Sequence, residues 1–550
     1  MDSTRRTLLR SGALAALVPA GVLAGTRPTA AAPPPRRDPF TLGVASGDPA
    51  PDGFVIWTRL APDPLVDTGL GGMPARDHRV GWQVATDERF RHVVRAGVAT
   101  ARPANAHAVH VEVGGLRPGR EYFYRFRLAS WLSPTGRSLT TPGAGAPVSS
   151  LAMAFVSCSS YQHGYFTAYR HLAEERPDVI LHLGDYQYEG PANNGQRSHL
   201  GGETVTLADY RRRYAQYKTD PDLQAAHGVA PWLPVWDDHE LDNNYAGELS
   251  EKPAEQGAFL QRRADAYRAY YGNVPLRRRS VPRGIDLQLY RRVSWGSLAS
   301  FHMLDTRQYR DDQACGDGYR ECPDAFAPGR SLPGWEQERW LLEGFRDSRA
   351  TWDVLGQQVF FGRRDSNADP AVEQVSMDAW DGYDASRQRL INGMETSGVR
   401  NPVVVTGDVH AHWASEVYRN QDEPDSGTVA SEFVTSSITT GGDGYDKADG
   451  QHPWAAYNPN LQFWTNLRGY VSTTITPSEM TVDYRCVTQV TSPGSPVFTR
   501  ARFVVEDAVR GMQQTLDAPL VGAAGARRSA PSDEQIIEDT LREETGRPGG

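Results

Sequence analysis

The sequence predicts an α/β fold preceded by a smaller all-β region. Between residues 38 and 145, short runs rich in β-branched and aromatic residues are separated by turn signals. From residue 148 onward, apolar runs typical of buried strands alternate with helical segments, which is the pattern of an α/β domain. The chain has 550 residues and is 39% hydrophobic, which is enough for two or three domains with sizeable cores.

The N-terminus has the features of an export signal. Arg5 and Arg6 precede an apolar stretch at residues 12–25, and three alanines at residues 30–32 offer a cleavage site. The arginine pair predicts a twin-arginine (Tat) signal peptide over residues 1–32, with the Tat translocase as a partner during export. The protein is then expected to be secreted or associated with the cell wall. An ordinary secretory signal with arginines by chance is the alternative.

The all-β region is expected to form a small immunoglobulin- or fibronectin-like β-sandwich. Strands are predicted at residues 54–57, 80–84, 108–113 and 121–128. Tyr122, Tyr124 and Phe126 alternate and therefore share one face of their strand. The region contains no catalytic constellation, so we expect it to pack and position the rest of the chain. Adhesion or carbohydrate binding is the alternative.

The α/β domain is expected over residues 148–508, after a Gly/Ala/Pro-rich linker at residues 142–147. Predicted strands lie at residues 152–156, 179–183, 235–236, 298–304, 352–361 and 402–406. Predicted helices lie at residues 165–175, 254–271 and 336–345. Residues 509–550, which are Ala/Gly-rich and then acidic at residues 533–544, are expected to be a flexible acidic tail with a short helix.

Composition excludes several classes of protein. The formal charge of −9 disfavours nucleic acid as a partner, and no internal apolar run is long enough to cross a membrane. We expect a monomer.

Four cysteines are few for an exported chain, so disulfides are not its main support. Cys315 and Cys322 are expected to form a local bridge, whereas Cys486 is expected to be a buried core thiol.

Four short polar segments each follow an apolar run, at residues 157–159, 184–188, 236–244 and 407–412. Ligands of open α/β sheets bind where the strands end. Gly184 permits a sharp turn that leaves Asp185 at the end of its strand, and Gly407 and Asp408 repeat this arrangement. One such segment would be read as a turn. Four of them in this order, supplying Asp, His, Tyr, Asn and Cys, predict a binuclear metallophosphoesterase.

The residue types indicate which metals are expected. Asp185 is the expected bridge between two cations, because a carboxylate has two ligand oxygens. A Tyr188 phenolate favours a hard, acidic ion such as Fe³⁺, and a Cys158 thiolate favours a transition metal over Mg²⁺ or Ca²⁺ alone.

The segment after Trp236 is polar in a different way. Asp237, Asp238, Asn243 and Asn244 supply oxygen ligands, which suit Ca²⁺ or Mg²⁺. His239 is a candidate for orienting or protonating a leaving group. Glu240 and Asp242 are interpreted as loop solvation and are left out of the site.

These motifs resemble those of the alkaline phosphatase D (PhoD) family of secreted metallophosphoesterases. The resemblance rests on the twin-arginine signal and on residues 155–166, 182–189, 236–244, 304–310 and 406–414, and it extends to about residue 505. It implies a β-sandwich followed by a four-layered α-β-β-α metallophosphoesterase domain. The tail matches the family's C-terminal helix weakly, so no lid over the site is predicted.

The resemblance also implies an Fe³⁺ centre with Ca²⁺. The residues that it places around iron and its bridge are Cys158, Asp185, Tyr188, Asp408 and His410, and those that it places on the calcium side are Asp237 and Asn244. Residues 184–188 also resemble the iron-tyrosinate motif of purple acid phosphatases. Asp408 stands where the wider superfamily has the first histidine of a Gly-His-x-His motif. The role of His412 therefore stays open between ligand, support and packing.

We therefore expect a secreted, metal-dependent phosphatase of the alkaline phosphatase D type, which hydrolyses phosphate mono- and diesters with metal-activated water. The expected catalytic residues are Asp185, His239 and Arg307; Arg307 is either a phosphate clamp or a structural salt bridge. One alternative is a phospholipase D-type phosphodiesterase acting on phospholipid or teichoic acid diesters. An alternative of another class is a wall-binding module with a vestigial site.

Overall fold

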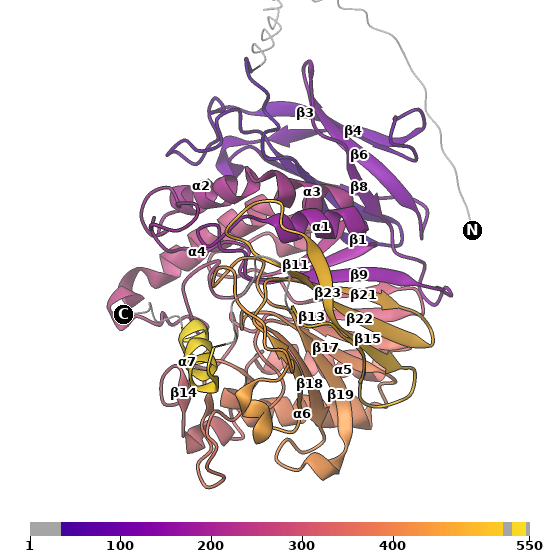
Figure 1. Ribbon diagram of the computed structural model, residues 1–550. Helices are drawn as coiled ribbons and strands as arrows, with labels where there is room; N and C mark the ends of the chain where they lie inside the picture. Colours follow the sequence, from indigo (N-terminus) through magenta and orange to yellow (C-terminus); the bar gives the residue numbers. More distant parts are fainter. Residues whose placement is uncertain (1–34, 521–530, 546–550) are drawn as a thin grey trace, which may run out of the picture. The chain divides into compact units, whose positions relative to one another are not determined.

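The computed structural model describes residues 35–520 and 531–545, and the chain from Pro35 onward forms one compact unit (Figure 1). The expected signal peptide lies outside the described residues. No described helix is both long and apolar enough to cross a bilayer.

Ten strands form the larger sheet. In spatial order they are β24 (Gln513–Asp517), β23 (Val497–Glu506), β22 (Glu479–Val487), β21 (Gly469–Ile475), β9 (Leu151–Val156), β10 (Val179–Leu183), β11 (Pro231–Val235), β1 (Val44–Ala50), β2 (Gly53–Arg59) and β5 (Ala108–Val113). Strands β9, β10, β11 and β1 pair in parallel, and the remaining pairs are antiparallel.

A second sheet has seven strands. Their order is β12 (Arg291–Trp295), β13 (Ala299–Met303), β15 (Trp352–Gly356), β17 (Pro402–Thr406), β19 (Thr428–Val434), β18 (His412–Tyr418) and β20 (Leu461–Thr465). The two sheets share one hydrophobic core, to which Phe155 and Leu181 contribute from the first sheet and Phe301 and Val405 from the second. The carboxyl ends of β9, β10, β11 and β17 carry the four polar segments of the sequence.

Helices cover both sheets. Side chains of α1 (Thr167–Glu175), α2 (Leu207–Lys218), α3 (Pro221–Val229) and α4 (Gln256–Asn273) belong to the core of the larger sheet. Helices α5 (Trp335–Asp347) and α6 (Asp384–Thr396) share a second core with the seven-stranded sheet. The mixed α/β class predicted from the alternation of strands and helices is thereby confirmed.

The N-terminal region, where a small immunoglobulin- or fibronectin-like sandwich was expected, divides its strands between two sheets. Strands β4 (Val93–Ala101), β3 (His78–Ala85), β6 (Glu121–Leu128), β7 (Trp131–Leu132) and β8 (Gly136–Leu139) form a separate sheet, and Tyr122, Tyr124 and Phe126 are buried against β1, β2 and β5. Those three partner strands belong to the ten-stranded sheet, because β1 pairs with β11 through Ser46 and Pro231. One layer of the N-terminal region is therefore continuous with the sheet that carries the polar segments.

The C-terminal segment differs from the expected flexible tail. Residues 513–517 form β24, which pairs with β23. Helix α7 (Asp533–Glu544) begins after the N-cap Ser532, and its Ile536 is fully buried. Glu544 at its end forms an ion pair with Arg364 at 2.7 Å and accepts a hydrogen bond from the hydroxyl of Tyr319 at 2.6 Å. The acidic composition suggested solvation, but the charge of Glu544 has buried partners.

The cysteine predictions are confirmed. Cys315 and Cys322 form a disulfide, with their Cα atoms 6.2 Å apart. Cys486 is free and buried. The disulfide closes a loop that contains strand β14 (Tyr319–Arg320), which pairs with β16 (Val375–Ser376).

Candidate metal centre

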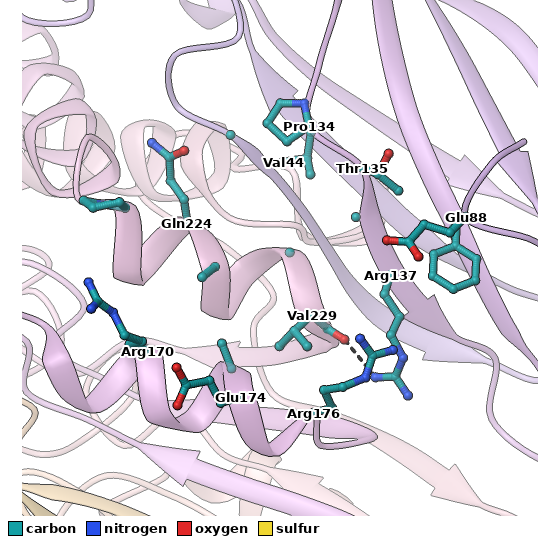
Figure 2. A pocket seen from close by; sticks show the side chains of 17 residues that line it. Val44, Glu88, Pro134, Thr135, Arg137, Arg170, Glu174, Arg176, Gln224 and Val229 are labelled. Carbon is teal, nitrogen blue, oxygen red and sulfur yellow. Dashed lines mark hydrogen bonds between the residues drawn. The ribbon is translucent and has the colours of Figure 1, made fainter. Parts of the chain in front are cut away.

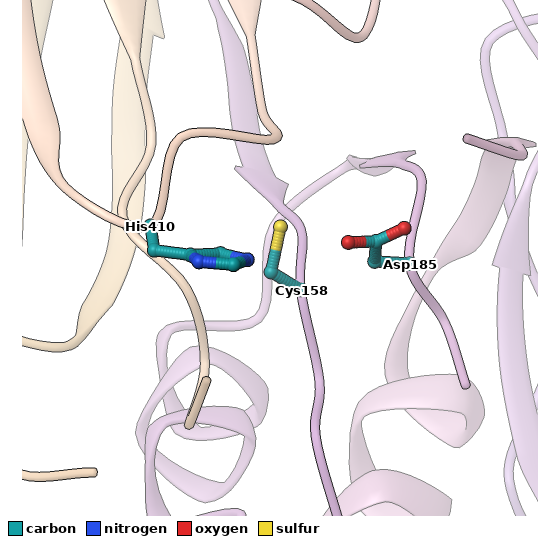
Figure 3. A group of neighbouring side chains, drawn as sticks. All are labelled: Cys158, Asp185 and His410. Atoms are coloured by element: carbon teal, nitrogen blue, oxygen red, sulfur yellow. The ribbon is translucent and has the colours of Figure 1, made fainter. Parts of the chain in front are cut away.

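Three of the predicted metal ligands meet at the ends of three strands. Cys158 follows β9, Asp185 follows β10 and His410 follows β17, and Figure 3 shows their side chains converging. One ligand atom from each lies within 4.8 Å of the other two. The set combines a sulfur, a carboxylate oxygen and an imidazole nitrogen, which are ligands that suit a transition metal.

A second group of ligand atoms shares Asp185 with the first. Asp185, Asp238 and His239 also offer one atom each within 4.8 Å of one another. A carboxylate that belongs to both ligand groups can offer one oxygen to a cation in each group and so bridge the two cations. This geometry fits the bridging role expected of Asp185.

Tyr188 closes the first group from one side. Its hydroxyl donates a hydrogen bond to Asp185 Oδ2 at 2.9 Å and lies 3.2 Å from His410 Nε2. The hydroxyl of Thr440 donates to it at 2.8 Å. Burial and the neighbouring Asp185 carboxylate raise the pKa of Tyr188 well above its usual value. A cation at this point would reverse that effect by stabilising the phenolate.

The backbone is strained where these side chains are presented. Five predicted ligands have positive φ angles, which lie in a backbone region that residues other than glycine rarely adopt. They are Cys158 (59°), Asp185 (55°), Asn244 (47°), Asp408 (64°) and His410 (55°). Strain of this kind persists only where the surrounding structure enforces it, and it concentrates at functional sites.

Asp237 is placed differently from the expectation. It lies next to Gly184 in the fold, but its Oδ1 forms an ion pair with Arg307, and the ligand group around Asp185 contains Asp238 instead. Sequence reasoning placed Asp238 in the cluster but left it out of the ligand set. The adjacent carboxylates carry equal weight in the sequence, and only the backbone path decides which one faces Asp185.

Arg307 does not line the cavity beside the candidate metal centre, where a phosphate clamp would lie. Its side chain is fully buried and lies within 4.0 Å of four carboxylates, those of Asp237, Asp238, Asp378 and Asp408. These contacts correspond to the salt-bridge alternative. Asp408 is held here too, because its Oδ1 accepts from Arg307 at 3.5 Å.

Asn244 lies beside the second group. Its backbone N–H donates to Asp238 Oδ2 at 2.7 Å, and its side-chain nitrogen donates to Asp317 Oδ2 at 3.1 Å. Asp317 belongs to the disulfide-closed loop, so this distant segment also contributes to the wall of the site. No local signal in the sequence links residue 317 to residue 244.

Glu240 is a functional residue that the sequence interpretation excluded. It is buried, and it accepts hydrogen bonds from the backbone N–H groups of Asp185 (3.1 Å), Tyr186 (2.6 Å) and Asp237 (2.9 Å). One carboxylate thus joins the loops after β10 and β11. Its spacing of three residues after Asp237 was the available signal, since a glutamate can reach back to the backbone N–H of the residue three positions earlier, as in a capping box.

His239 is the third member of the second group. Its Nδ1 is 2.7 Å from Glu189 Oε2, and its ring packs against that of Tyr188 at a tilt of 35°, with the ring centres 4.2 Å apart. Glu189 also accepts from the backbone N–H of Asn243 at 3.1 Å. The sequence interpretation did not single out Glu189, which holds the imidazole in a fixed orientation.

His412 belongs to neither group. It is fully buried, its Nδ1 accepts from the backbone N–H of Ser436 at 2.9 Å, and its ring packs against Tyr484. Burial lowers its pKa to about 3. These contacts correspond to two of the three roles left open for His412, support of the site and packing, and not to the role of a metal ligand.

The donor set fits cations. Among the described residues, Asp185 Oδ1, Asp237 Oδ2 and His410 Nδ1 are buried and lack a hydrogen-bond partner. Burial raises the pKa of Asp185 and of Asp408 well above the usual range, and neighbouring carboxylates raise both further. Buried acceptors without donors, crowded with like charges, are the arrangement that a bound cation stabilises.

A cavity of about 750 Å³ opens onto these groups. Tyr188, His239 and Asn243 line it, together with Asp317 and Arg320 of the disulfide-closed loop. The volume is in the range of ligand pockets and exceeds what a phosphoryl group alone requires.

A second cavity, of about 500 Å³, contains none of the predicted site residues (Figure 2). Its arginines are occupied by protein partners: Arg137 donates to the carbonyl oxygens of Pro177 and Val229, Arg170 pairs with Asp222, and Arg176 pairs with Glu121. We assign it no role.

Comparison with known proteins agrees with the geometry. Residues 153–484 match the family model described as PhoD-like phosphatase, and residues 25–142 match the one described as PhoD-like phosphatase, N-terminal domain. Alkaline phosphatase D of Bacillus subtilis (strain 168) is 47% identical over 505 residues, which cover 90% of this chain and 85% of that protein. A solved structure of PhoD superposes with a TM-score of 0.88 at 46% identity, covering 94% of this chain and 99% of that one. The similarity includes every loop of the candidate metal centre.

Proposed function

The chain belongs to the PhoD-like phosphatase family, and from that premise we propose that it is a secreted, metal-dependent phosphatase that hydrolyses phosphate mono- and diesters. It is a phosphoric ester hydrolase of the alkaline phosphatase D type. The observation that carries the metal dependence is the position of Asp185, whose carboxylate belongs to both ligand groups. We also propose that the two sheets and their helices correspond to a four-layered metallophosphoesterase domain.

The donor types divide the proposed metals between the two groups. Cys158, Tyr188 and His410, with Asp185, would hold Fe³⁺. Asp408 is a neighbour of this set, because its backbone carbonyl lies 3.7 Å from Cys158 Sγ. Asp238 and Asn244, with Asp185, would hold Ca²⁺ through oxygen ligands. When bound, such ions lower the pKa of water and neutralise charge on phosphoryl oxygens.

The protein's own groups define the rest of the mechanism. His239 lines the cavity, and the bond between its Nδ1 and Glu189 leaves Nε2 as the atom that donates a proton to the departing alcohol. Glu240 fixes the loops that carry Asp185 and Asp238, so the ligands are preorganised. Arg307 neutralises the carboxylates of Asp237, Asp238, Asp378 and Asp408 and does not line the cavity.

The test compares initial rates of the wild-type enzyme and Asp185→Asn on an aryl phosphate monoester, the matching diester and phosphatidylcholine. We expect turnover of the aryl esters that falls at least about 100-fold in the variant, with an unchanged circular dichroism spectrum. Full activity of Asp185→Asn would contradict the metal model. Dominant choline release would move the assignment to a phospholipase D-type diesterase. Absence of turnover on all three would favour the wall-binding alternative.

Export is tested separately. Replacing Arg5 and Arg6 by lysine should retain the enzyme inside the cell if the Tat pathway carries it. Unchanged secretion of that variant would indicate the ordinary secretory route.

A further inference from the structure

The cavity presents an electrostatic problem to an anionic substrate. Four carboxylates line it, those of Glu189, Glu203, Glu251 and Asp317. A phosphate ester carries negative charge, so a basic side chain in these walls that is free of carboxylate partners would favour its entry, in addition to the attraction of the proposed metal ions. The basic side chains of the wall are Lys252, Arg320 and the histidines His163 and His239.

The positive charge of Lys252 is already neutralised by carboxylates of the protein. Its ammonium lies 3.7 Å from Glu203, 3.8 Å from Asp242 and 3.6 Å from Glu255. Three carboxylates around one ammonium leave no net positive charge for a ligand. The fully buried Arg307 is likewise occupied by carboxylates and does not line the cavity.

Arg320 is different. It is exposed, and its Nε donates to the backbone carbonyl of Asp317 at 3.1 Å. Within the described ranges, no carboxylate lies within 4.0 Å of its guanidinium nitrogens, in contrast to the arginines of the second cavity. The terminal nitrogens of Arg320 are thus free to donate to a ligand, and a guanidinium matches the geometry of a phosphate group.

The fold fixes where this guanidinium lies. The disulfide between Cys315 and Cys322 closes the loop, and β14 pairs with β16 through Arg320 and Val375. Tyr319, the preceding residue, is buried and its hydroxyl donates to Glu544. Because successive side chains of a strand point to opposite faces, burial of Tyr319 turns Arg320 outward, where it lines the cavity.

We propose that Arg320 is the substrate-binding arginine of this enzyme, donating hydrogen bonds to the non-bridging oxygens of the phosphate ester in the catalytic cavity. The inference rests on the proposed phosphatase function. It transfers the clamp role that the sequence suggested for Arg307 to a residue of the disulfide-closed loop.

The test uses Arg320→Gln, Arg320→Lys and a charge-matched control, Arg339→Gln, in the full-length mature enzyme. Arg339 is exposed on α5 and does not line the cavity. For Arg320→Gln we expect about a tenfold or larger rise in KM for the aryl monoester and in the inhibition constant of inorganic phosphate, with kcat within about threefold. Arg320→Lys should recover part of the loss by restoring the charge, and Arg339→Gln should match the wild type.

Direct binding of inorganic phosphate, measured by calorimetry, separates this inference from the proposed function. A wild-type enzyme that binds phosphate through Arg320 but turns over no ester would refute the function and keep the binding site. An unchanged dissociation constant in Arg320→Gln would overturn the inference, whatever the activity. A fall in kcat alone would also overturn it, because it would assign Arg320 to the chemical step.

Discussion

Replacing Arg307 by methionine should destabilise the protein more strongly without metal than with it. The guanidinium lies 2.8 Å from Asp378, 3.5 Å from Asp408 and 3.9 Å from Asp238, and it also pairs with Asp237. Removing one partner of a buried ion pair costs about 3–5 kcal/mol, because the other charge stays buried without compensation. Here four carboxylates lose their common partner, so we expect the free energy of unfolding of the metal-free protein to fall by about 5 kcal/mol.

Bound cations should reduce this cost, since they neutralise part of the same carboxylate cluster. The assay is urea unfolding followed by tryptophan fluorescence, in a chelator and then in saturating Ca²⁺. Arg307→Lys is the matched control, because it keeps the charge and should lose less. A difference below about 1 kcal/mol between wild type and Arg307→Met in the chelator would refute the reasoning.

Three further predictions follow from the site and its supports. The iron-loaded Tyr188→Phe variant should lose the visible charge-transfer absorption that an iron-bound phenolate produces. Glu240→Gln removes the oxygen that accepts from the N–H groups of Asp185 and Asp237, and two unsatisfied buried donors should lower the free energy of unfolding by about 2–6 kcal/mol. His227 is a buried residue of α3 whose Nε2 lies 2.8 Å from the hydroxyl of Tyr186, next to Asp185 in the sequence. Burial lowers the pKa of His227 well below its ordinary value of 6.5, so its contribution to stability is present above pH 6.5 and is lost as the pH falls. In His227→Gln the pH dependence of stability below pH 6.5 should be flatter by up to about 1.4 kcal/mol per pH unit.

Each of these has a result that would contradict it. An unchanged visible spectrum of Tyr188→Phe would remove the phenolate from the iron site. Wild-type stability of Glu240→Gln would show that its hydrogen bonds do not support the loops. A His227→Gln protein as sensitive to pH as the wild type would place the titrating group elsewhere.

Local patterns were sufficient for much of the fold. The strands that became β9, β10 and β17 are largely apolar runs, and they end two residues before Cys158, Asp185 and Asp408, respectively. Strand β11 was predicted at residues 235–236 only, because Pro231 and Pro234 signal a break. It nevertheless forms as a buried parallel strand.

The candidate site was predictable where the motif itself supplies the ligand. Cys158, Asp185 and His410 meet as expected, because each follows a strand of the two central sheets. For Glu240, only the contact with the backbone N–H of Asp237 was predictable, from the three-residue spacing. Its contact with Tyr186 and the position of Arg320 in the cavity wall depend on distant segments of the chain, which no local pattern records.

The ten-stranded sheet has a consequence for the order of folding. Strand β9, which leads to Cys158, lies between β10 and β21, and Phe155 pairs with Val471 from near the other end of the chain. During synthesis this edge of β9 stays unpaired until β21 leaves the ribosome, long after the rest of the site has been made. Pairing across such a separation is slow, and an open strand edge invites aggregation. Fragments that end before β21 should therefore be poorly soluble, and the nascent chain depends on protection of this edge until translation is nearly complete.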